Sequence, residues 1–197
     1  MAVKANHDIS SGLDTAFINS AINSNLAYRP EFVSNDYTQG KKVSVAIERE
    51  FRHCDAFYIS VAFITEGGLA PLKQVLAELR DKGIPGKILT TSYLTFTEPK
   101  ALKTLADLSN VEVRVYDSTD EGASGFHTKG YIFKEEEIYR FIVGSSNMTA
   151  SAFSVNKEWN TKLVSTSDGE LLKQMMTEFN ALWNSKHTLA VKDFIED

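Results

Sequence analysis

The first half of the chain alternates between short apolar runs and amphipathic segments. Residues 56–64 form an almost continuous apolar run, residues 86–92 form a second, and residues 111–116 alternate apolar and polar side chains with a period of two. Such runs are typical of β-strands, and the first is typical of a strand covered on both faces. Between them, residues 69–80 and 98–108 repeat apolar side chains every three or four positions, which predicts amphipathic helices. This order of elements favours an α/β layer with parallel strands.

The second half of the chain predicts a different arrangement. Strands are expected over 128–133 and 138–143, joined by the charged turn 134–137, with a further strand over 159–164. Residues 171–183 carry apolar side chains at helical spacing and predict a long helix that packs on the sheet and closes the domain. The expected fold class is therefore α/β, with a mixed, mostly parallel central sheet flanked by helices on both faces.

Local signals predict where several elements begin and end. Gly67-Gly68 is expected to end the first strand, and Thr97 is expected to cap the helix that has Pro99 in its first turn. A helix expected over 14–26 must end before Pro30, because the residue before a proline avoids the helical region.

Three parts of the chain follow from these boundaries. Residues 1–40 are expected to form an N-terminal arm with one helix and a connecting loop over 30–40. Residues 41–185 are expected to form the main domain, which opens with a helix that has Val43, Ile47 and Phe51 on its apolar side. Residues 186–197 are either a tail or the start of a following segment.

Composition narrows the class of protein. The chain has 197 residues, of which 43% are hydrophobic, enough to bury the core of one domain. Its net charge of -5 argues against a broad electrostatic coat for nucleic acid, but not against a local basic groove. Cys54 is the one cysteine, so no intrachain disulfide forms and a reducing, cytoplasmic compartment is expected. No apolar run is long enough to span a bilayer, and the first eight residues lack the apolar core of a signal peptide.

Two pairs of polar residues stand where packed strands would not favour them. His127 and Lys129 are two apart, so on a strand they share one face, and Ser145 and Asn147 repeat that spacing after the next strand. A hairpin that brings the pairs together describes a pocket for an anion. A histidine nucleophile also needs a group that holds one tautomer, and Glu158 is the best candidate.

The ordered pieces around these residues resemble a known signature. His127-Thr128-Lys129, Gly144-Ser145-Ser146-Asn147 and Asn156-Lys157-Glu158-Trp159-Asn160 resemble the HxK…GSxN…E (HKD-type) signature of the phospholipase D superfamily, particularly its small nuclease-type members with one signature per chain. The style of the sequence also resembles the phospholipase-D-like modules of bacterial helicases and restriction endonucleases.

The resemblance implies a phosphodiesterase that works through a phosphohistidine, with no metal and no cofactor. It implies that His127 is the nucleophile, that Lys129 and Asn147 hold the phosphate oxygens with help from Ser145, and that Glu158 orients the imidazole. Four further positions are expected to support the site: Gly144, which relaxes the turn, Ser146, Asn160 and Glu135. No set of His, Cys, Asp and Glu residues has the spacing of metal ligands.

The chain departs from the family pattern at one position. The family has an aspartate five residues after the lysine, where this chain has Lys134 followed by Glu135. Either a one-residue shift in the hairpin lets Glu135 substitute, or that role is absent.

The chemistry also predicts an assembly and a substrate. One His127 cannot serve as both the nucleophile and the acid that protonates the leaving oxygen, so a homodimer is expected to complete the site. Nucleic acid, with DNA favoured, is the expected partner; no membrane partner is expected, and a helicase or specificity domain outside this chain is possible in the same protein. Two alternatives stay open: a phospholipid or small-diester hydrolase or transferase, and a degenerate module that binds nucleic acid or dimerises.

Overall fold

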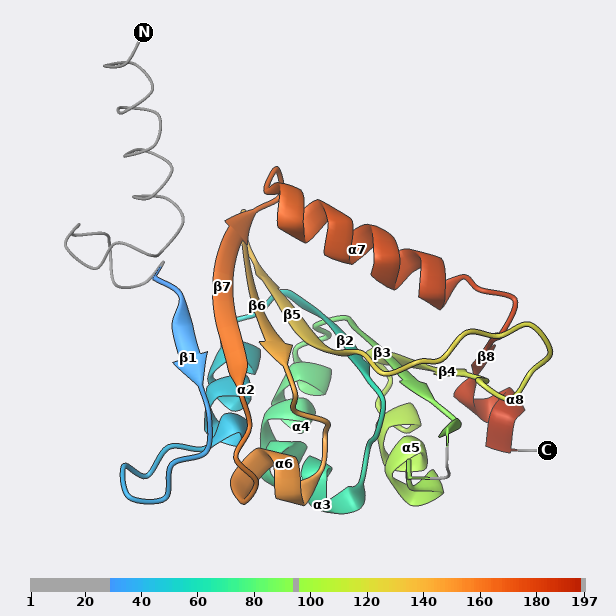
Figure 1. Ribbon diagram of the computed structural model, residues 1–197, viewed down its shortest axis with the longest axis horizontal. Coiled ribbons are helices and arrows are strands. Elements are labelled where there is room, and N and C mark those ends of the chain that lie inside the picture. Colours follow the sequence, from blue (N-terminus) through green and yellow to red (C-terminus); the bar gives the residue numbers. More distant parts are fainter. Residues whose placement is uncertain (1–28, 94–95, 196–197) are drawn as a thin grey trace, which may run out of the picture.

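A mixed sheet forms the centre of the molecule. The computed structural model describes residues 29–93 and 96–195, so the helix expected over 14–26 lies outside the described residues. Within those residues, eight strands form one sheet in the order β1-β7-β6-β5-β2-β3-β4-β8 (Figure 1). The strands are β1 (Glu31–Val33), β2 (Ala56–Val61), β3 (Gly86–Thr91), β4 (Val111–Tyr116), β5 (Lys129–Glu135), β6 (Ile138–Gly144), β7 (Asn160–Thr166) and β8 (Thr188–Ala190).

The pairing of these strands corrects one expectation. β2, β3 and β4 are parallel to one another, as the first half of the chain predicts. All other pairs are antiparallel, so the expectation of a mostly parallel sheet is wrong. One reason is that only two residues join β5 to β6, and strands joined by so short a turn pair antiparallel.

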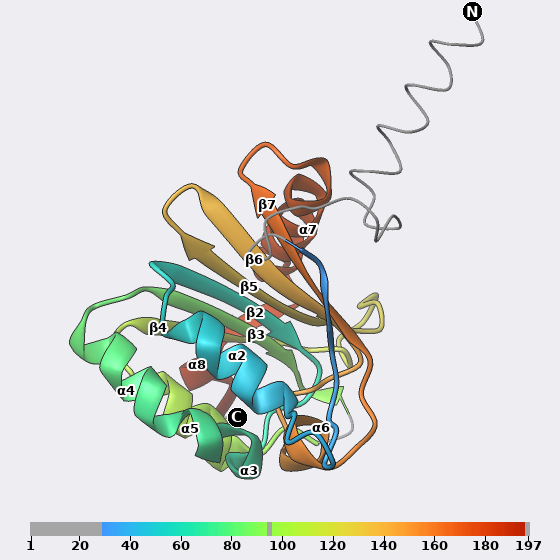
Figure 2. The ribbon, with the colours of Figure 1, turned by 90° about the vertical axis from the view of Figure 1, so that its left-hand side faces the viewer.

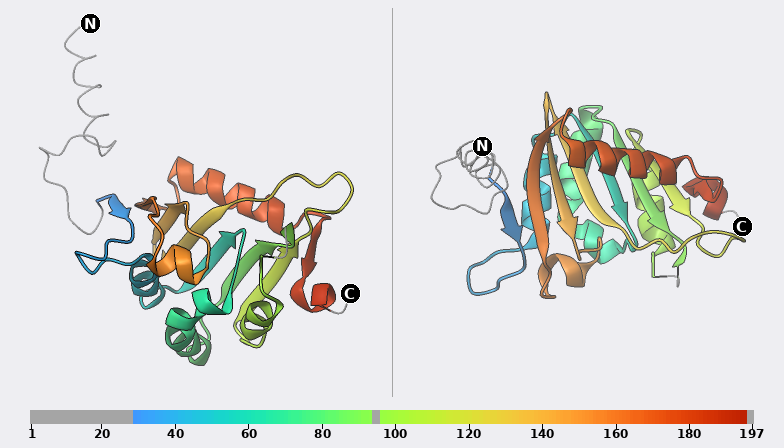
Figure 3. Two further views of the ribbon diagram at one scale, coloured as in Figure 1. Left: turned by 60° about the horizontal axis from the view of Figure 1, so that its bottom comes forward. Right: turned by 45° about the horizontal axis from the view of Figure 1, so that its top comes forward.

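Helices cover both faces of the sheet, which confirms the predicted layering. One face carries α2 (Val43–Phe51), α3 (Glu66–Leu69), α4 (Lys73–Asp81), α5 (Pro99–Ala106), α6 (Ala150–Ser154) and α8 (Val191–Ile195). Of the described helices, α7 (Glu170–Trp183) is the one that covers the other face (Figure 2). Figure 3 shows α7 running across the strands.

Two hydrophobic layers hold this arrangement. The larger lies under α2, α4 and α5 and includes Phe51, Phe57 and Phe133, whose rings meet edge to face. The smaller lies under α7, where Phe179 stacks on Trp183 at 5.6 Å. The predicted helix over 171–183 therefore packs on the sheet as expected.

The segment after β2 differs from its prediction. The helix expected over 69–80 begins earlier, as α3, and a short 3-10 turn η2 (Ala70–Leu72) separates α3 from α4. Thr65 caps α3 by accepting a hydrogen bond from the Gly68 N–H at 3.1 Å. Gly67-Gly68 therefore starts a helix rather than only breaking a strand. Gly68 is needed there because a Cβ would lie 2.0 Å from the Met148 carbonyl oxygen.

One further correction concerns a cap. Glu98, not Thr97, occupies the N-cap position of α5, and the Thr97 hydroxyl instead donates to the Ala62 carbonyl at 3.3 Å. At the two ends of the described chain, the loop expected over 30–40 contains β1, and the segment after residue 185, expected to be a tail or the start of a following segment, contains β8 and α8. β1 and β8 are the two edge strands of the sheet.

Candidate active site

The predicted site residues come together at one edge of the sheet, namely the edge formed by the ends of the central strands and not by an outer strand. β2 and β6 end at this edge, where α3 and α6 lie side by side (Figure 3), and β5 and β7 begin there. The register places Gly130 opposite Val143 and Gly144 opposite Asn160. The segments that carry His127, Asn147 and Glu158 are therefore neighbours, as the hairpin prediction requires.

His127 and Lys129 contact each other at the start of β5. The Lys129 ammonium nitrogen lies 2.8 Å from His127 Nδ1 and donates to the His127 carbonyl oxygen at 3.0 Å. His127 is exposed, and Lys129 is partly buried. A solvent-accessible imidazole beside a held ammonium group is the pairing expected of a nucleophile and a phosphate-binding cation.

Phe63 joins the histidine to the next part of the site. Its ring meets the His127 ring edge-on, with the centroids 6.1 Å apart. Its backbone N–H donates to Asn147 Oδ1 at 3.1 Å, and its carbonyl accepts from the Met148 N–H at 3.0 Å. The Asn147 oxygen thus already accepts a hydrogen bond from Phe63, two residues after the end of β2. The amide nitrogen is therefore the atom of that side chain left to donate toward a phosphate.

Ser145 is bound to Glu158. The Ser145 hydroxyl donates to Glu158 Oε2 and accepts from the Trp159 N–H at 3.1 Å. Glu158 is 7% exposed, so this is a buried carboxylate with a charge-assisted hydrogen bond. The hydroxyl proton of Ser145 is therefore engaged with Glu158 rather than directed at a phosphate.

No contact among the described residues of one chain supports the prediction that Glu158 orients His127. Among the described residues, no hydrogen bond joins the two side chains, and the His127 ring nitrogens contact Lys129. The orienting role of Glu158 stays a prediction.

The turn after β6 is anchored from beneath. Asn160 is buried; its Oδ1 accepts from the Ser146 N–H at 3.2 Å, and its Nδ2 donates to Ser146 Oγ at 2.9 Å and to the Val33 carbonyl at 3.1 Å. A buried tyrosine, Tyr131, donates to the Ser146 carbonyl at 3.0 Å. Ser146 and Asn160 thus hold the turn in place, and they do not point to the expected phosphate.

Gly144 is not needed to relax the turn after β6, which was its expected role. Its φ angle is not positive, so the turn does not require a glycine for its conformation. A Cβ at this position would lie 2.2 Å from the Trp159 carbonyl oxygen and 2.6 Å from the Asn160 Cα. Gly144 therefore allows β6 to approach the start of β7 closely.

Burial and charge act together on the ionisable groups. Burial lowers the pKa of Lys129, and the negative charge of Glu158 opposes that shift. Burial, followed by the same carboxylate, raises the pKa of Tyr131 well above its ordinary value. Glu158 therefore helps Lys129 to keep its proton and keeps the Tyr131 phenol as a donor.

Two hollows adjoin this edge of the sheet. A cleft of about 590 Å³ lies beside the site and is lined by Phe63, Phe96, Asn147, Glu158 and residues at the start of α3 and α6. A second, mainly apolar groove of about 390 Å³ lies under α7 on the other face, and Ser60, Thr128 and Gly130 line it close to the site. The first hollow gives a substrate access to Asn147 and Glu158.

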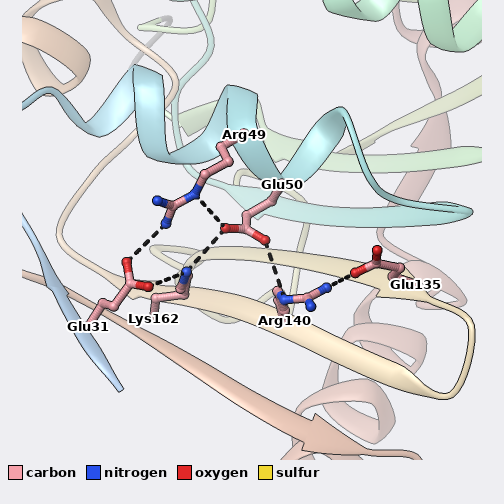
Figure 4. Close-up of polar contacts among 6 residues, drawn as sticks. All are labelled: Glu31, Arg49, Glu50, Glu135, Arg140 and Lys162. Atoms are coloured by element: carbon pink, nitrogen blue, oxygen red, sulfur yellow. Dashed lines mark hydrogen bonds and ion pairs between the residues drawn. The ribbon is translucent and has the colours of Figure 1, made fainter. Parts of the chain in front are cut away.

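Glu135 lies away from this site. It is the last residue of β5, six residues after Lys129, and a strand rises about 3.3 Å per residue, so the two are about 20 Å apart. Its carboxylate pairs with Arg140, whose Nε lies 3.9 Å from the buried Glu50. The same Glu50 meets Lys162 at 3.3 Å (Figure 4). The expectation that Glu135 supports the reaction is wrong in this geometry, because the side chain belongs to an ion network between α2 and the sheet.

Sequence reasoning did not identify Phe63 and Tyr131 as site residues. Both stand in apolar runs, where an aromatic side chain is expected to fill the core, and in both the functional contact comes from a backbone group or a phenol tip. No signal in one sequence separates such residues from ordinary core residues.

Within the described part of the chain, no group of three or more His, Cys, Asp and Glu side chains is placed to hold a metal ion. None of its helices is long and apolar enough to cross a membrane.

Comparisons with known proteins place these features in context. A family model described as cardiolipin synthase, PLD-like domain, matches residues 55–183. No curated protein sequence matches the chain.

Solved structures with this fold have distant sequences. Nuc from Salmonella typhimurium, described as a phospholipase D family member, has a TM-score of 0.61 at 16% identity, over 82% of this chain and 98% of that one. NucT from Helicobacter pylori has a TM-score of 0.62 at 14% identity, over 83% and 99%. A phosphatidylserine synthase from Haemophilus influenzae Rd KW20 has a TM-score of 0.61 at 15% identity, over 87% of this chain but 42% of its own length.

Proposed function

Because the chain belongs to the phospholipase D-like family, we propose that it is a metal-independent phosphodiesterase that cleaves nucleic acid through a covalent phosphohistidine at His127. The observation that carries the proposal is the contact between His127 and Lys129, beside Asn147 and Glu158 at one edge of the sheet. These four residues supply a nucleophile, a cation, an amide donor and a carboxylate.

The first step is an in-line displacement. A ring nitrogen of His127 forms a bond to phosphorus while the bond from phosphorus to the leaving oxygen breaks, and that oxygen takes a proton from an acid on the far side. The Lys129 ammonium and the Asn147 amide nitrogen donate to the non-bridging oxygens, where negative charge grows. In the second step, water attacks the phosphorus and the bond from phosphorus to the His127 nitrogen breaks. The proton that the water loses goes back to the acid of the first step.

The acid in this scheme comes from a second copy of the chain. One His127 cannot stand on both sides of the phosphorus, and its exposure leaves room for a second imidazole. An isologous homodimer brings two His127 side chains to a single phosphate. Ser145 contributes by holding Glu158 rather than by binding the phosphate.

Nucleic acid is proposed as the substrate on two grounds. The chain carries one signature, and the fold that it shares with Nuc and NucT covers 98% and 99% of those proteins, whereas it covers less than half of the phosphatidylserine synthase. The shared fold thus spans nearly the whole length of Nuc and NucT. A helicase or specificity domain elsewhere in the same protein fits this proposal as well.

One observation favours a second candidate, a phospholipid or small-diester substrate. The groove under α7 is lined mainly by apolar side chains, and it reaches Thr128 and Lys129 at the candidate site. An acyl chain is an occupant of suitable chemistry for such a groove. The two candidates share the same reaction and differ in what flanks the phosphate.

A cleavage assay tests the proposal. The protein is incubated with labelled single-stranded and duplex DNA, RNA and phosphatidylglycerol, each with excess EDTA. We expect nucleic acid to be cleaved as fast with EDTA as without it. We also expect a labelled covalent adduct on His127 after acid-free quenching.

Matched variants complete the assay. His127→Ala is expected to lower cleavage by several orders of magnitude while binding survives. His53→Ala, which removes an exposed histidine at the end of α2, is expected to change nothing. Cleavage of the lipid alone would favour the second candidate, and wild-type protein that binds DNA without cleaving it would favour a degenerate module. Loss of all cleavage with EDTA would exclude the histidine mechanism.

A further inference from the structure

Two large aromatic rings stand exposed side by side next to the site. Trp159 is 75% exposed and Phe32 is 65% exposed. Their ring centroids lie 5.9 Å apart in an edge-to-face arrangement, one ring from the start of β7 and one from β1. Exposed aromatic surface of this kind marks a place where another molecule binds.

Trp159 is fixed to the candidate catalytic residues by its backbone. Its N–H donates to Ser145 Oγ at 3.1 Å, and its carbonyl accepts from the Ser145 N–H at 3.1 Å. It follows Glu158 directly in sequence. These contacts fix the backbone of Trp159 at the candidate site, while the indole itself is exposed to solvent.

We propose that Trp159, braced by Phe32, is a stacking platform for a base that flanks the scissile phosphate of single-stranded nucleic acid, an inference that rests on the nuclease function proposed above. Stacking of a base on an aromatic side chain contributes about 1–3 kcal/mol. Bases in a duplex have both faces covered by their neighbours, so the platform selects strands whose bases are free.

The net charge bears on how a nucleic-acid strand would be held. The net charge of the chain is -5, so long-range attraction to phosphates contributes little to binding. A short-range contact such as stacking is then needed to hold the strand. The backbone contacts of Trp159 with Ser145 place it at the candidate site, which argues for substrate rather than for a partner that binds elsewhere.

Tryptophan fluorescence reads this contact directly. The chain has two tryptophans, and the other, Trp183, is 2% exposed under α7. The His127→Ala protein, which binds without turnover, is titrated with a single-stranded oligonucleotide and with the matching duplex. We expect quenching by the single strand that is lost in the His127→Ala, Trp159→Phe double variant.

Affinity gives an independent measure. With a labelled oligonucleotide and anisotropy, Trp159→Ala is expected to weaken single-strand binding about 5- to 150-fold, which is the stacking contribution converted at 1.4 kcal/mol per factor of ten. Trp159→Phe, which keeps a ring, is expected to lose much less. Tyr37→Ala, which removes a ring that is 98% exposed on the turn after β1, is the control and is expected to bind as the parent does.

Several results would overturn the inference. Equal single-strand affinity for Trp159→Ala and its parent, with active wild-type protein, would remove the platform and leave the nuclease intact. Conversion of a dimer to a monomer by Trp159→Ala in sedimentation would assign the rings to an interface. A fluorescence response to phosphatidylglycerol vesicles but not to DNA would assign them to lipid. If the wild-type protein neither bound nor cleaved nucleic acid, the proposed function would fail together with the platform.

Discussion

Replacing Asn160 with alanine removes three hydrogen bonds that hold the turn of the candidate site. Asn160 is 3% exposed; it bonds twice to Ser146 and once to the Val33 carbonyl. The same side chain therefore connects the turn after β6 with the edge strand β1. Its loss affects both the stability of the fold and the position of Asn147.

The size of the effect follows from these contacts. A hydrogen bond contributes about 1 kcal/mol net, so three give roughly 3 kcal/mol, and the buried Ser146 N–H left without its acceptor adds to this. We expect the free energy of unfolding to fall by about 3–4 kcal/mol. A turn that moves by about 1 Å also displaces the Asn147 amide, for which a loss of roughly 100-fold in kcat is typical.

Urea unfolding and single-turnover cleavage measure the two effects. Asn110→Ala is the matched control, since among the described residues Asn110 makes one side-chain bond, to the Ile84 carbonyl, and its buried Oδ1 has no partner. We expect that control to cost no more than about 1 kcal/mol and to leave kcat unchanged. Equal losses for the two variants would refute the assignment of Asn160 as the anchor of the turn.

Three more changes test the site and its surroundings. Glu158→Gln removes the charge that helps Lys129 keep its proton, so the pKa of Lys129 falls further and the loss of kcat/KM with rising pH begins at a lower pH; an unshifted alkaline limb would contradict this. Glu135→Gln breaks its ion pair with Arg140, and we expect a loss of about 1 kcal/mol in urea unfolding with kcat within about threefold of the parent, whereas a large fall in kcat would return Glu135 to the site. Gly144→Ala puts a Cβ 2.2 Å from a backbone oxygen, and we expect thermal unfolding to show a loss of about 3 kcal/mol or more.

Strong periodic signals predicted most of the fold. The strand expected over 111–116 is β4, and the helix expected over 171–183 is α7, because a period of two and a stripe of apolar side chains each specify one conformation and one buried face. The spacing of His127 and Lys129 likewise predicted their contact. The family model confirms the resemblance that the signature predicted.

The remaining features depend on contacts between distant parts of the chain. β1 and β8 have three residues each and α6 has five, too few for a periodic pattern, and all three form because a neighbouring strand or helix is already in place. The antiparallel pairing of β5 with β2 is also a property of the whole sheet. Ser145 illustrates the same limit within the site, since its partner Glu158 is 13 residues away and the sequence alone assigns Ser145 to the phosphate and Glu158 to the imidazole of His127.

The geometry of β5 bears on whether the altered signature still supports catalysis. Lys129 begins the strand at the site, whereas Lys134, in the position of the family's aspartate, stands five residues along, about 16 Å away at about 3.3 Å per residue. The neighbouring Glu135 pairs with Arg140, which approaches the buried Glu50. The altered position therefore lies at the end of β5 far from His127, next to a residue of an ion network. This location removes one of the two reasons for a degenerate module, and the other, the net charge of -5, concerns the affinity for nucleic acid and not the chemistry of the histidine.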